Sequence, residues 1–390
     1  LQDPNPTNKL AYAAAFDHCI GCRACETACP SGVPFSLLES GQHLVAGNIS
    51  HPSSMVNFLS RRLDSVTVLN FLRKAGSAGR CVLRWVLGSR WRQRLDGATL
   101  GAGTMVRLLG SMPVSPQNDQ KLIQQIDQLL GTKSIPASAG KAEKTESQAV
   151  AFFIGCANEG LIPESTRRLT ELLEYLGCEI QYLKNQGCCG ALADHTGRPG
   201  KAALLKRANS QSMEFLPEGL PVLVEAAGCG LQLKEYGPSV SEKIVDAAVF
   251  LSTLSISGLR EIPLTVAYHD PCHGRHGQGI YSEPRKLLQQ IPGLKLVEAQ
   301  ESEMCCGSGG AWGLHHQEMS DELGKRKARN LAATGADLVV TSNPGCLGQV
   351  ADGLLSEGIP VPVLALMDLL WYAFFTAEKK IDTKSLQIVF

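Results

Sequence analysis

The chain has 390 residues, and its 37 basic residues equal its 37 acidic residues in number. Hydrophobic residues make up 44% and charged residues 19%, which excludes an intrinsically disordered chain, and the zero net charge argues against a nucleic-acid-binding protein. The 14 cysteines are too many for packing alone, in a chain far too long for a small disulfide-stapled scaffold. Their arrangement is therefore the main guide to function.

The ends of the chain give expectations about location. The sequence begins at Leu1 without a recognisable signal peptide, and its longest apolar stretch, over 361–375, is shorter than the roughly 20 residues of a membrane-spanning helix. We expect a cytoplasmic protein, at most peripheral on the inner face of the cytoplasmic membrane, whose thiols are metal ligands rather than disulfides. Because Met is absent, we also expect that an N-terminal segment has been removed.

Residues 1–50 are predicted to form a small α-helical ferredoxin-type module. The segment CIGCRACETACP has the spacing C-x2-C-x2-C-x3-C-P, formed by Cys19, Cys22, Cys25 and Cys29. This run is typical of bacterial ferredoxins that bind [4Fe–4S] clusters, and its fourth cysteine serves a second cluster when two are present. Zinc is disfavoured because its cysteine pairs are usually separated by a longer loop.

The chain has no second run of this kind to hold a partner cluster. Either Cys29 or Cys81 completes a single cluster, or the partner run belongs to a segment that precedes Leu1. We favour the missing segment, so that the module over 1–50 is N-terminally incomplete.

Residues 51–148 are predicted to be a helical basic region followed by a linker. Nine Arg or Lys but only one acid, Asp64, occur over 61–94. This region could lie on an anionic membrane surface, dock on an acidic partner subunit, or form a solvated amphipathic helix over the ferredoxin module. A short helix is expected near 118–130, before a polar linker.

From residue 149 onward, apolar runs alternate with amphipathic segments. The runs AVAFFIG, PVLVEAAG, LTVAYHD and ADLVVTSNPG predict buried parallel strands. The segments STRRLTELLEYLG and SDELGKRKARNLAATG predict helices between them. This alternation predicts an α/β layered architecture with parallel sheets.

The same region contains an internal repeat of cysteines. The two sets are Cys156, Cys188, Cys189 and Cys229, and Cys272, Cys305, Cys306 and Cys346. The gaps are 31 and 39 residues in the first set and 32 and 39 in the second, so we predict two homologous α/β lobes over 149–260 and 261–390. Since loops after parallel strands converge at one edge of a sheet, four thiols could meet in each lobe.

Adjacent cysteines suit a polynuclear cluster better than one tetrahedral zinc, because they can ligate different irons. Buried structural cysteine is the alternative, which we expect only for Cys81 and Cys178. All twelve cysteines of the three sets are predicted to bind the cofactor. The ferredoxin run and the set of the second lobe are the predicted metal ligands.

This pattern resembles the cysteine-rich (CCG) domains found in heterodisulfide reductase and in several dehydrogenase iron–sulfur subunits. A ferredoxin module followed by two CCG domains is most similar to the glycolate oxidase iron–sulfur subunit family, whose motifs CRxCExxCPSGV and AxxCG are similar to CRACETACPSGV and AAGCG here. The resemblance implies one to three [4Fe–4S] clusters, an FAD-containing dehydrogenase subunit as partner, and a quinone or membrane acceptor.

Two departures from these families limit what the resemblance implies. The glycolate oxidase subunit normally has two ferredoxin runs, whereas this chain has one. Heterodisulfide-reductase lobes end in C-x-x-C, whereas Cys229 is followed by GLQ and Cys346 by LGQ. Four cysteines per lobe argue against a disulfide-cleaving noncubane cluster. They fit an ordinary [4Fe–4S] site in one or both lobes, or a structural role for a lobe.

Four polar residues, His269, Asp270, His273 and His276, surround Cys272. A histidine here could ligate metal or relay protons, or the group could orient the Cys272 loop by hydrogen bonds, and we favour the second interpretation. The glycines of CGSGGAWG do not form a dinucleotide-binding fingerprint, because they follow a cysteine pair rather than a strand. No flavin site and no catalytic residue is predicted.

The sequence therefore predicts an electron-transfer subunit of a 2-hydroxyacid oxidoreductase, most similar to that of glycolate oxidase. The alternatives are a heterodisulfide reductase-like catalyst, the equivalent subunit of a D-lactate or glycerol-3-phosphate dehydrogenase, and a non-redox scaffold or zinc protein.

Overall fold

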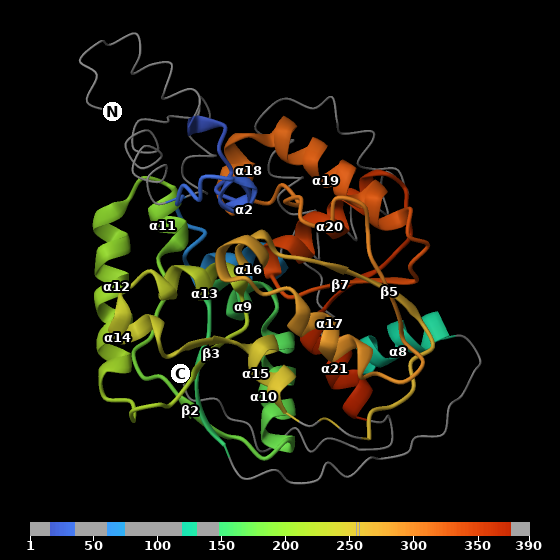
Figure 1. Cartoon of the computed structure of the whole chain (residues 1–390), viewed down its shortest axis with the longest axis horizontal. Coiled ribbons are helices and arrows are strands. Elements are labelled where there is room, and N and C mark those ends of the chain that lie inside the picture. The colour runs from blue at the N-terminus through green and yellow to red at the C-terminus, as the bar shows by residue number, and fades with distance from the viewer. Residues whose placement is uncertain are drawn as a thin grey trace.

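The structure is a computed structural model that describes residues 16–35, 61–74, 119–130, 148–254, 256 and 258–375. Figure 1 shows two α/β halves side by side, the first mostly green and yellow and the second orange and red. Each half contains a four-stranded parallel sheet, which confirms the predicted fold class. The predicted basic region after residue 74, with Cys81, lies outside the described residues.

The first lobe is built on the strand order β2-β1-β3-β4, with every pairing parallel. Its strands are β1 (Ala149–Phe153), β2 (Glu179–Tyr182), β3 (Val222–Val224) and β4 (Ile244–Asp246). Its helices are α9 (Cys156–Leu161), α10 (Pro163–Tyr175), α11 (Ala191–His195), α12 (Pro199–Glu214), α13 (Ala227–Lys234), α14 (Pro238–Ser241) and α15 (Ala247–Thr253). β1 coincides with the run AVAFFIG and is buried after its first residue, as a strand covered on both faces requires.

The second lobe repeats this topology in the order β6-β5-β7-β8, again all parallel. Its strands are β5 (Thr265–His269), β6 (Lys295–Val297), β7 (Leu338–Thr341) and β8 (Val363–Ala365). Its helices are α16 (Cys272–Gln278), α17 (Ser282–Gln289), α18 (Trp312–His315), α19 (Gln317–Ala332), α20 (Pro344–Ser356) and α21 (Leu366–Phe374). The predicted strands and helices are confirmed, while the domain limits 149–260 and 261–390 stay a prediction.

The strand order fixes where loops converge. In each sheet the first strand is central, and the second and third strands pair on opposite sides of it. The connections after the first and the second strand therefore lead to opposite sides of the central strand. The loops that follow the strands diverge at this position, which leaves a crevice at the carboxyl edge of the sheet. The cysteines of each lobe lie in these loops or in the first turn of the helix that follows them.

The two lobes share one hydrophobic core. Its largest apolar cluster takes side chains from β1 and α10 in the first lobe and from β5, β7 and α21 in the second. α10 packs against α21, where the guanidinium of Arg168 lies 2.8 Å from the carboxylate of Asp368 and both side chains are buried. The predicted short helix is confirmed as α8 (Asp119–Leu130), which packs on α21. The lobes are thus held in a fixed relation.

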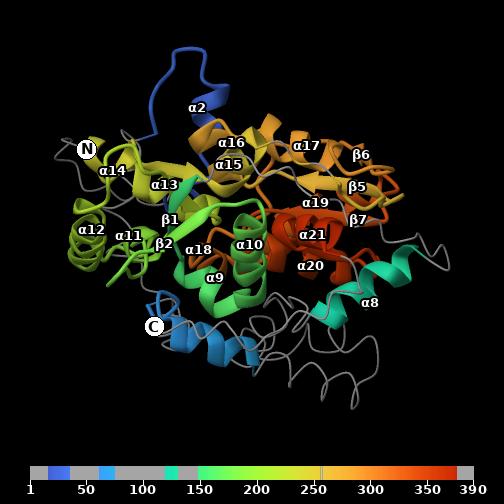
Figure 2. The same ribbon diagram turned by 90° about the horizontal axis from the view of Figure 1, so that it is seen from below.

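The ferredoxin-type segment contacts both lobes, and Arg23 forms an ion pair with Glu235 of the first lobe. Its helix α2 (Ala24–Ala28) packs against α16, and the two lie side by side in both Figure 1 and Figure 2. The indole N–H of Trp312 donates to the carbonyl oxygen of Asp17 at 3.2 Å, and the Trp312 ring stacks on His316. Within the described residues, no helix is both long and apolar enough to span a bilayer.

Candidate iron–sulfur site

Cys19 and Cys22 of the ferredoxin run lie in a tight loop before α2, and Cys25 lies in the first turn of α2. Gly21 and Arg23 both have positive φ, at 72° and 61°, and these two turns wrap the chain around Cys22. Burial raises the pKa of the Cys22 thiol, and the neighbouring thiols of Cys272, Cys19 and Cys25 raise it further. The loop therefore presents its sulfurs to one another and to the first cysteine of the second lobe.

Cys29 lies at the other end of α2, where it forms the C-cap. The backbone N–H groups of Val33, Ser31 and Gly32 point at its sulfur and lower its pKa. These donors stabilise a thiolate at a partly exposed position. That Cys29 ligates a cluster, its own or a second one, stays a prediction.

The first-lobe cysteines follow three strands of one sheet. Cys156 begins α9 after β1, the pair Cys188-Cys189 follows β2, and Cys229 lies in the first turn of α13 after β3. All four are buried, and the sulfurs of Cys156 and Cys188 are 3.4 Å apart. Their hydrogen bond lowers the pKa of Cys188 and raises that of Cys156.

The second-lobe cysteines occupy matching places. Cys272 begins α16 after β5, the pair Cys305-Cys306 follows β6, and Cys346 lies in the first turn of α20 after β7. The sulfurs of Cys272 and Cys305 are 3.8 Å apart. The side-chain amide of Asn343 lies 3.5 Å from the Cys346 sulfur.

A glycine follows each cysteine pair for a conformational reason. Gly190 and Gly307 have φ of 89° and 90°, and each directs its N–H at the first sulfur of its pair, 3.4 Å away. A Cβ on Gly307 would lie 2.7 Å from the backbone oxygen of Ser320. Any other residue would strain this turn and disturb the donor to the Cys305 sulfur.

All eight cysteines of the two lobes line a single cavity of about 160 Å³. Ile20 of the ferredoxin loop and the imidazoles of His195 and His273 complete its wall. The sequence predicted one convergence point per lobe, and the structure brings the two sets face to face across a common space.

The residues present fit an iron–sulfur cofactor. Each of the thirteen cysteines that the structure describes is free of disulfide bonding. Clustered thiolates are the donors that iron–sulfur clusters select, and the backbone N–H groups at Cys188 and Cys305 supply the hydrogen bonds that stabilise such sulfurs. The site can therefore hold clusters within reach of the ferredoxin loop.

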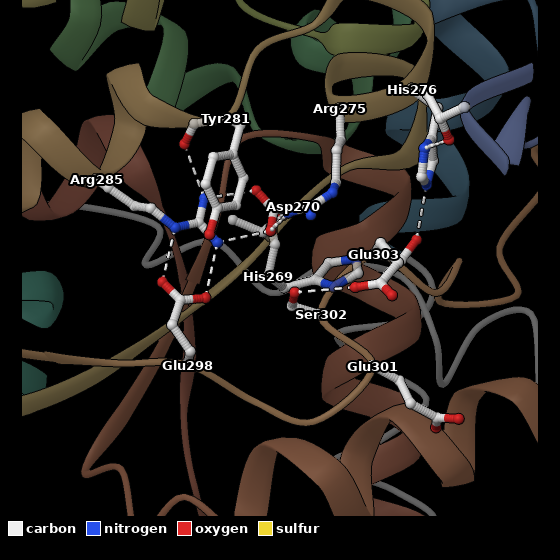
Figure 3. Close-up of polar contacts among 12 residues, drawn as sticks. His269, Asp270, Arg275, His276, Tyr281, Arg285, Glu298, Glu301, Ser302 and Glu303 are labelled. Atoms are coloured by element: carbon white, nitrogen blue, oxygen red, sulfur yellow. Dashed lines mark hydrogen bonds and ion pairs between the residues drawn. The ribbon is translucent and has the colours of Figure 1, made fainter.

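The polar residues around Cys272 mostly make loop-orienting hydrogen bonds, as expected. Figure 3 shows Asp270 held by both terminal nitrogens of Arg285, at 2.8 and 2.7 Å, with Arg275 beside it. The imidazole of His273 lies 3.0 Å from the carbonyl oxygen of Gly21, which links the Cys272 loop to the ferredoxin loop. His276 similarly bridges Thr27 and the Glu303 carbonyl.

His269 differs from these residues. Its ring is buried, and neither ring nitrogen has a hydrogen-bond partner among the described residues. One of its nitrogens lies within 4.8 Å of the sulfurs of both Cys306 and Cys346. Burial lowers the pKa of His269 to about 3, with a smaller contribution from Lys327, so the ring is neutral. The interpretation of His269 as a loop-orienting residue is not supported by its contacts.

Lys327 is a site residue that no sequence motif marks. It is buried in α19, where its ammonium donates to the carbonyl oxygens of Glu301 and Ser302 at 2.6 and 3.3 Å. Burial lowers its pKa, whereas the thiols of Cys306 and Cys305 act in the opposite direction. The buried ammonium of Lys327 therefore lies close enough to Cys305 and Cys306 to interact with them electrostatically.

Two family models match the chain. One, described as "Cysteine-rich domain", matches residues 150–234 and again 266–351, and the other, "4Fe-4S binding domain", matches residues 16–35. The matches confirm the repeat and the ferredoxin-type module. The chain is therefore an iron–sulfur protein that binds [4Fe–4S] clusters.

Comparison with curated proteins gives the family. The "Probable glycolate oxidase iron-sulfur subunit" of Bacillus subtilis is 32% identical over 90% of this chain and 81% of its own length. The "Glycolate oxidase iron-sulfur subunit" of Escherichia coli is 27% identical over 86% and 77%. A fumarate reductase (CoM/CoB) subunit of Methanothermobacter marburgensis is 33% identical over 58% and 46%. The chain belongs to the glycolate oxidase iron–sulfur subunit family.

Proposed function

We propose that the chain transfers electrons within a multi-subunit oxidoreductase that oxidises glycolate. In this proposal an FAD-containing subunit removes the electrons from glycolate, the present chain receives them, and a quinone is the final acceptor. Substrate oxidation belongs to the partner because the sequence contains no flavin- or dinucleotide-binding fingerprint. The names of the full-length relatives support glycolate as the substrate.

The observation that carries the proposal is the placement of the ferredoxin loop on the cysteine-lined cavity. Ile20 forms part of the cavity wall, and the Gly21 carbonyl lies 3.0 Å from the His273 ring. Because His273 directly follows Cys272, one hydrogen bond joins the two cysteine-bearing loops. This arrangement supports a continuous route for electrons between the ferredoxin run and the second lobe.

The ligand roles of the three cysteine sets are part of the proposal. A bound [4Fe–4S] cluster takes up and returns one electron at a time. The chain's own contribution is to bury seven of the eight lobe cysteines, to donate backbone N–H groups to Cys188 and Cys305, and to place the ammonium of Lys327 near Cys305 and Cys306. Burial and hydrogen bonds to sulfur are the features by which proteins set cluster potentials.

Cluster reduction by substrate in the purified complex tests the proposal. The chain is expressed with its flavoprotein partner, purified without oxygen, mixed with glycolate, D-lactate or glycerol-3-phosphate, and frozen for EPR. We expect glycolate to produce the signal that dithionite produces, and the isolated chain to respond to dithionite alone. A complex whose clusters respond to D-lactate or glycerol-3-phosphate but not to glycolate would exclude glycolate as the substrate.

A second candidate function follows from the position of both cysteine sets on one cavity. Sulfurs on two facing walls could hold a disulfide substrate between them, as a heterodisulfide reductase-like subunit would require. A direct assay of disulfide reduction by the dithionite-reduced chain decides this point. Thiol release at a rate above that of dithionite alone would favour this candidate over simple electron transfer.

A further inference from the structure

The second lobe has a nitrogen donor where the first lobe has a phenyl ring. His269 is the last residue of β5 and lies three residues before Cys272, and Phe153 is the last residue of β1 and lies three residues before Cys156. The Phe153 ring is buried in an apolar cluster that contains Cys189 and Cys229. The His269 ring is buried beside Cys306 and Cys346, which are the counterparts of those two cysteines.

The residues around His269 do not supply hydrogen-bond partners for its ring nitrogens. Both nitrogens are buried without a hydrogen-bond partner in the part of the chain that the structure describes. The adjacent carboxylate of Asp270 is engaged by two nitrogens of Arg285 (Figure 3). A buried polar group without a partner carries a free-energy penalty, which a phenyl ring at the same place would avoid. Packing alone therefore does not account for histidine at this position.

The distances suit a shared metal ion. A nitrogen of His269 and the sulfurs of Cys306 and Cys346 all lie within 4.8 Å of one another. A nitrogen about 2.0–2.1 Å and a sulfur about 2.3 Å from one tetrahedral metal stand roughly 3.5 Å apart, so small side-chain movements bring the three atoms onto one ion. Neutral imidazole and thiolate are both good ligands for iron and zinc.

We propose that His269 is a nitrogen ligand of the metal centre in the second lobe, whereas the centre of the first lobe has sulfur ligands only. The inference rests on the proposed binding of metal by the second-lobe cysteines. On a single iron or zinc ion, His269 would bind together with Cys306 and Cys346. On a [4Fe–4S] cluster, whose four irons take one protein ligand each, His269 would take one of the four places in the stead of a cysteine. A nitrogen ligand raises the potential of an iron–sulfur centre relative to thiolate, so the two lobes would differ in potential.

Isotope labelling of histidine tests this assignment. The full chain, purified without oxygen after growth with ¹⁵N-histidine or unlabelled histidine, is reduced with dithionite and measured by pulsed EPR. We expect a nitrogen coupling that changes with the label. In His269→Phe, which installs the first-lobe residue, the coupling is expected to disappear and metal retention against a chelator to fall by at least about 10–100-fold, the loss that even an outer-shell partner causes.

Two further variants serve as controls. His276→Gln removes a histidine from the same segment and is expected to leave the coupling unchanged. His269→Cys replaces nitrogen by sulfur and is expected to retain the metal while losing the coupling, which separates ligation from folding.

Metal analysis assigns the outcomes. Zinc with one nitrogen neighbour in its X-ray absorption spectrum would support the ligand role and identify the metal as zinc. An all-sulfur site, with His269→Phe as metal-rich as the wild type, would overturn the inference and leave the proposed electron transfer intact. A wild-type chain free of metal in both lobes would overturn both the ligand role of His269 and the proposed binding of clusters by the lobe cysteines.

Discussion

At the scale of single residues, a buried carboxylate next to the cysteine loops has an unusual environment. Glu225 follows β3 and accepts hydrogen bonds from Asn158 at 2.7 Å and from Ser165 and Thr166 at 3.1 Å. Burial, assisted by the nearby Asp368, raises its pKa to about 7, although the three hydrogen bonds oppose the shift. Folding therefore favours the protonated form of Glu225.

This shift predicts a loss of stability as pH rises. Because the pKa in the folded state lies above the ordinary value of 4.5, the folded chain binds more protons between about pH 4.5 and 7. Protonated Glu225 contributes on the order of 3 kcal/mol to the free energy of unfolding. This contribution is fully present below pH 4.5 and is lost as the pH rises through 7. Glu225→Gln should remove this dependence and unfold at higher urea concentration at pH 8.

The matched control for this prediction is Glu218→Gln, because Glu218 is exposed. Urea unfolding of both variants at pH 5 and pH 8 measures the difference. If Glu225→Gln changed the two midpoints equally, the carboxyl would not titrate in this window.

At the scale of elements, the contact of α10 with α21 joins the lobes through charge as well as apolar packing. Arg168 and Asp368 are almost fully buried, and their ion pair is 2.8 Å long. The indole N–H of Trp371 donates to Glu171 at 2.8 Å on the same contact. A buried pair of this kind adds little net stability, because the cost of taking both charges out of water offsets most of their attraction.

Removing one member of this ion pair should lower the free energy of unfolding more than removing both members. Arg168→Met leaves the Asp368 carboxylate without its buried partner, and we expect a loss of about 3–5 kcal/mol. The double variant Arg168→Met with Asp368→Leu should return close to the wild-type value. Denaturant unfolding followed by circular dichroism measures both, and a double variant no more stable than the single one would contradict this expectation.

A second element-scale prediction concerns residues 66–74, which are helical and whose Leu69 lies against Gly160 of α9. A Cβ on Gly160 would lie 2.5 Å from the Cβ of Leu69, so Gly160→Ala should displace this helix at a cost of about 1–3 kcal/mol. Gly200 in α12 has open space around it, and Gly200→Ala should be neutral or stabilising by up to about 1 kcal/mol. Hydrogen exchange of residues 66–74 should accelerate in the first variant alone.

At the scale of the whole molecule, much of the fold was predictable because its signals are local. The run AVAFFIG predicted β1, and SDELGKRKARNLAATG predicted most of α19, since hydrophobic periodicity and burial follow directly from residue order. The matched gaps between cysteines predicted the duplication, because an internal repeat can be read directly from residue order. The grouping of cysteines within each lobe followed from the geometry of parallel strands.

What could not be predicted depends on how separate segments pack together. Whether the two cysteine sets line one cavity depends on how the lobes pack together, and the Arg168–Asp368 contact between the lobes joins residues 200 positions apart in sequence. The partnerless ring of His269 and the buried ammonium of Lys327 are likewise visible only when every neighbour is placed. Sequence spacing alone carries no such information.

The central claim is that the ferredoxin loop and the cysteine-lined cavity hold clusters close enough to exchange electrons. Iron and sulfide counting combined with EPR of the dithionite-reduced, anaerobically purified chain tests it most directly. We predict about eight or more irons per chain, from at least two four-iron clusters, and a signal shaped by interaction between neighbouring clusters. Zinc in place of iron, about four irons or fewer, or signals from clusters that do not interact would contradict the claim.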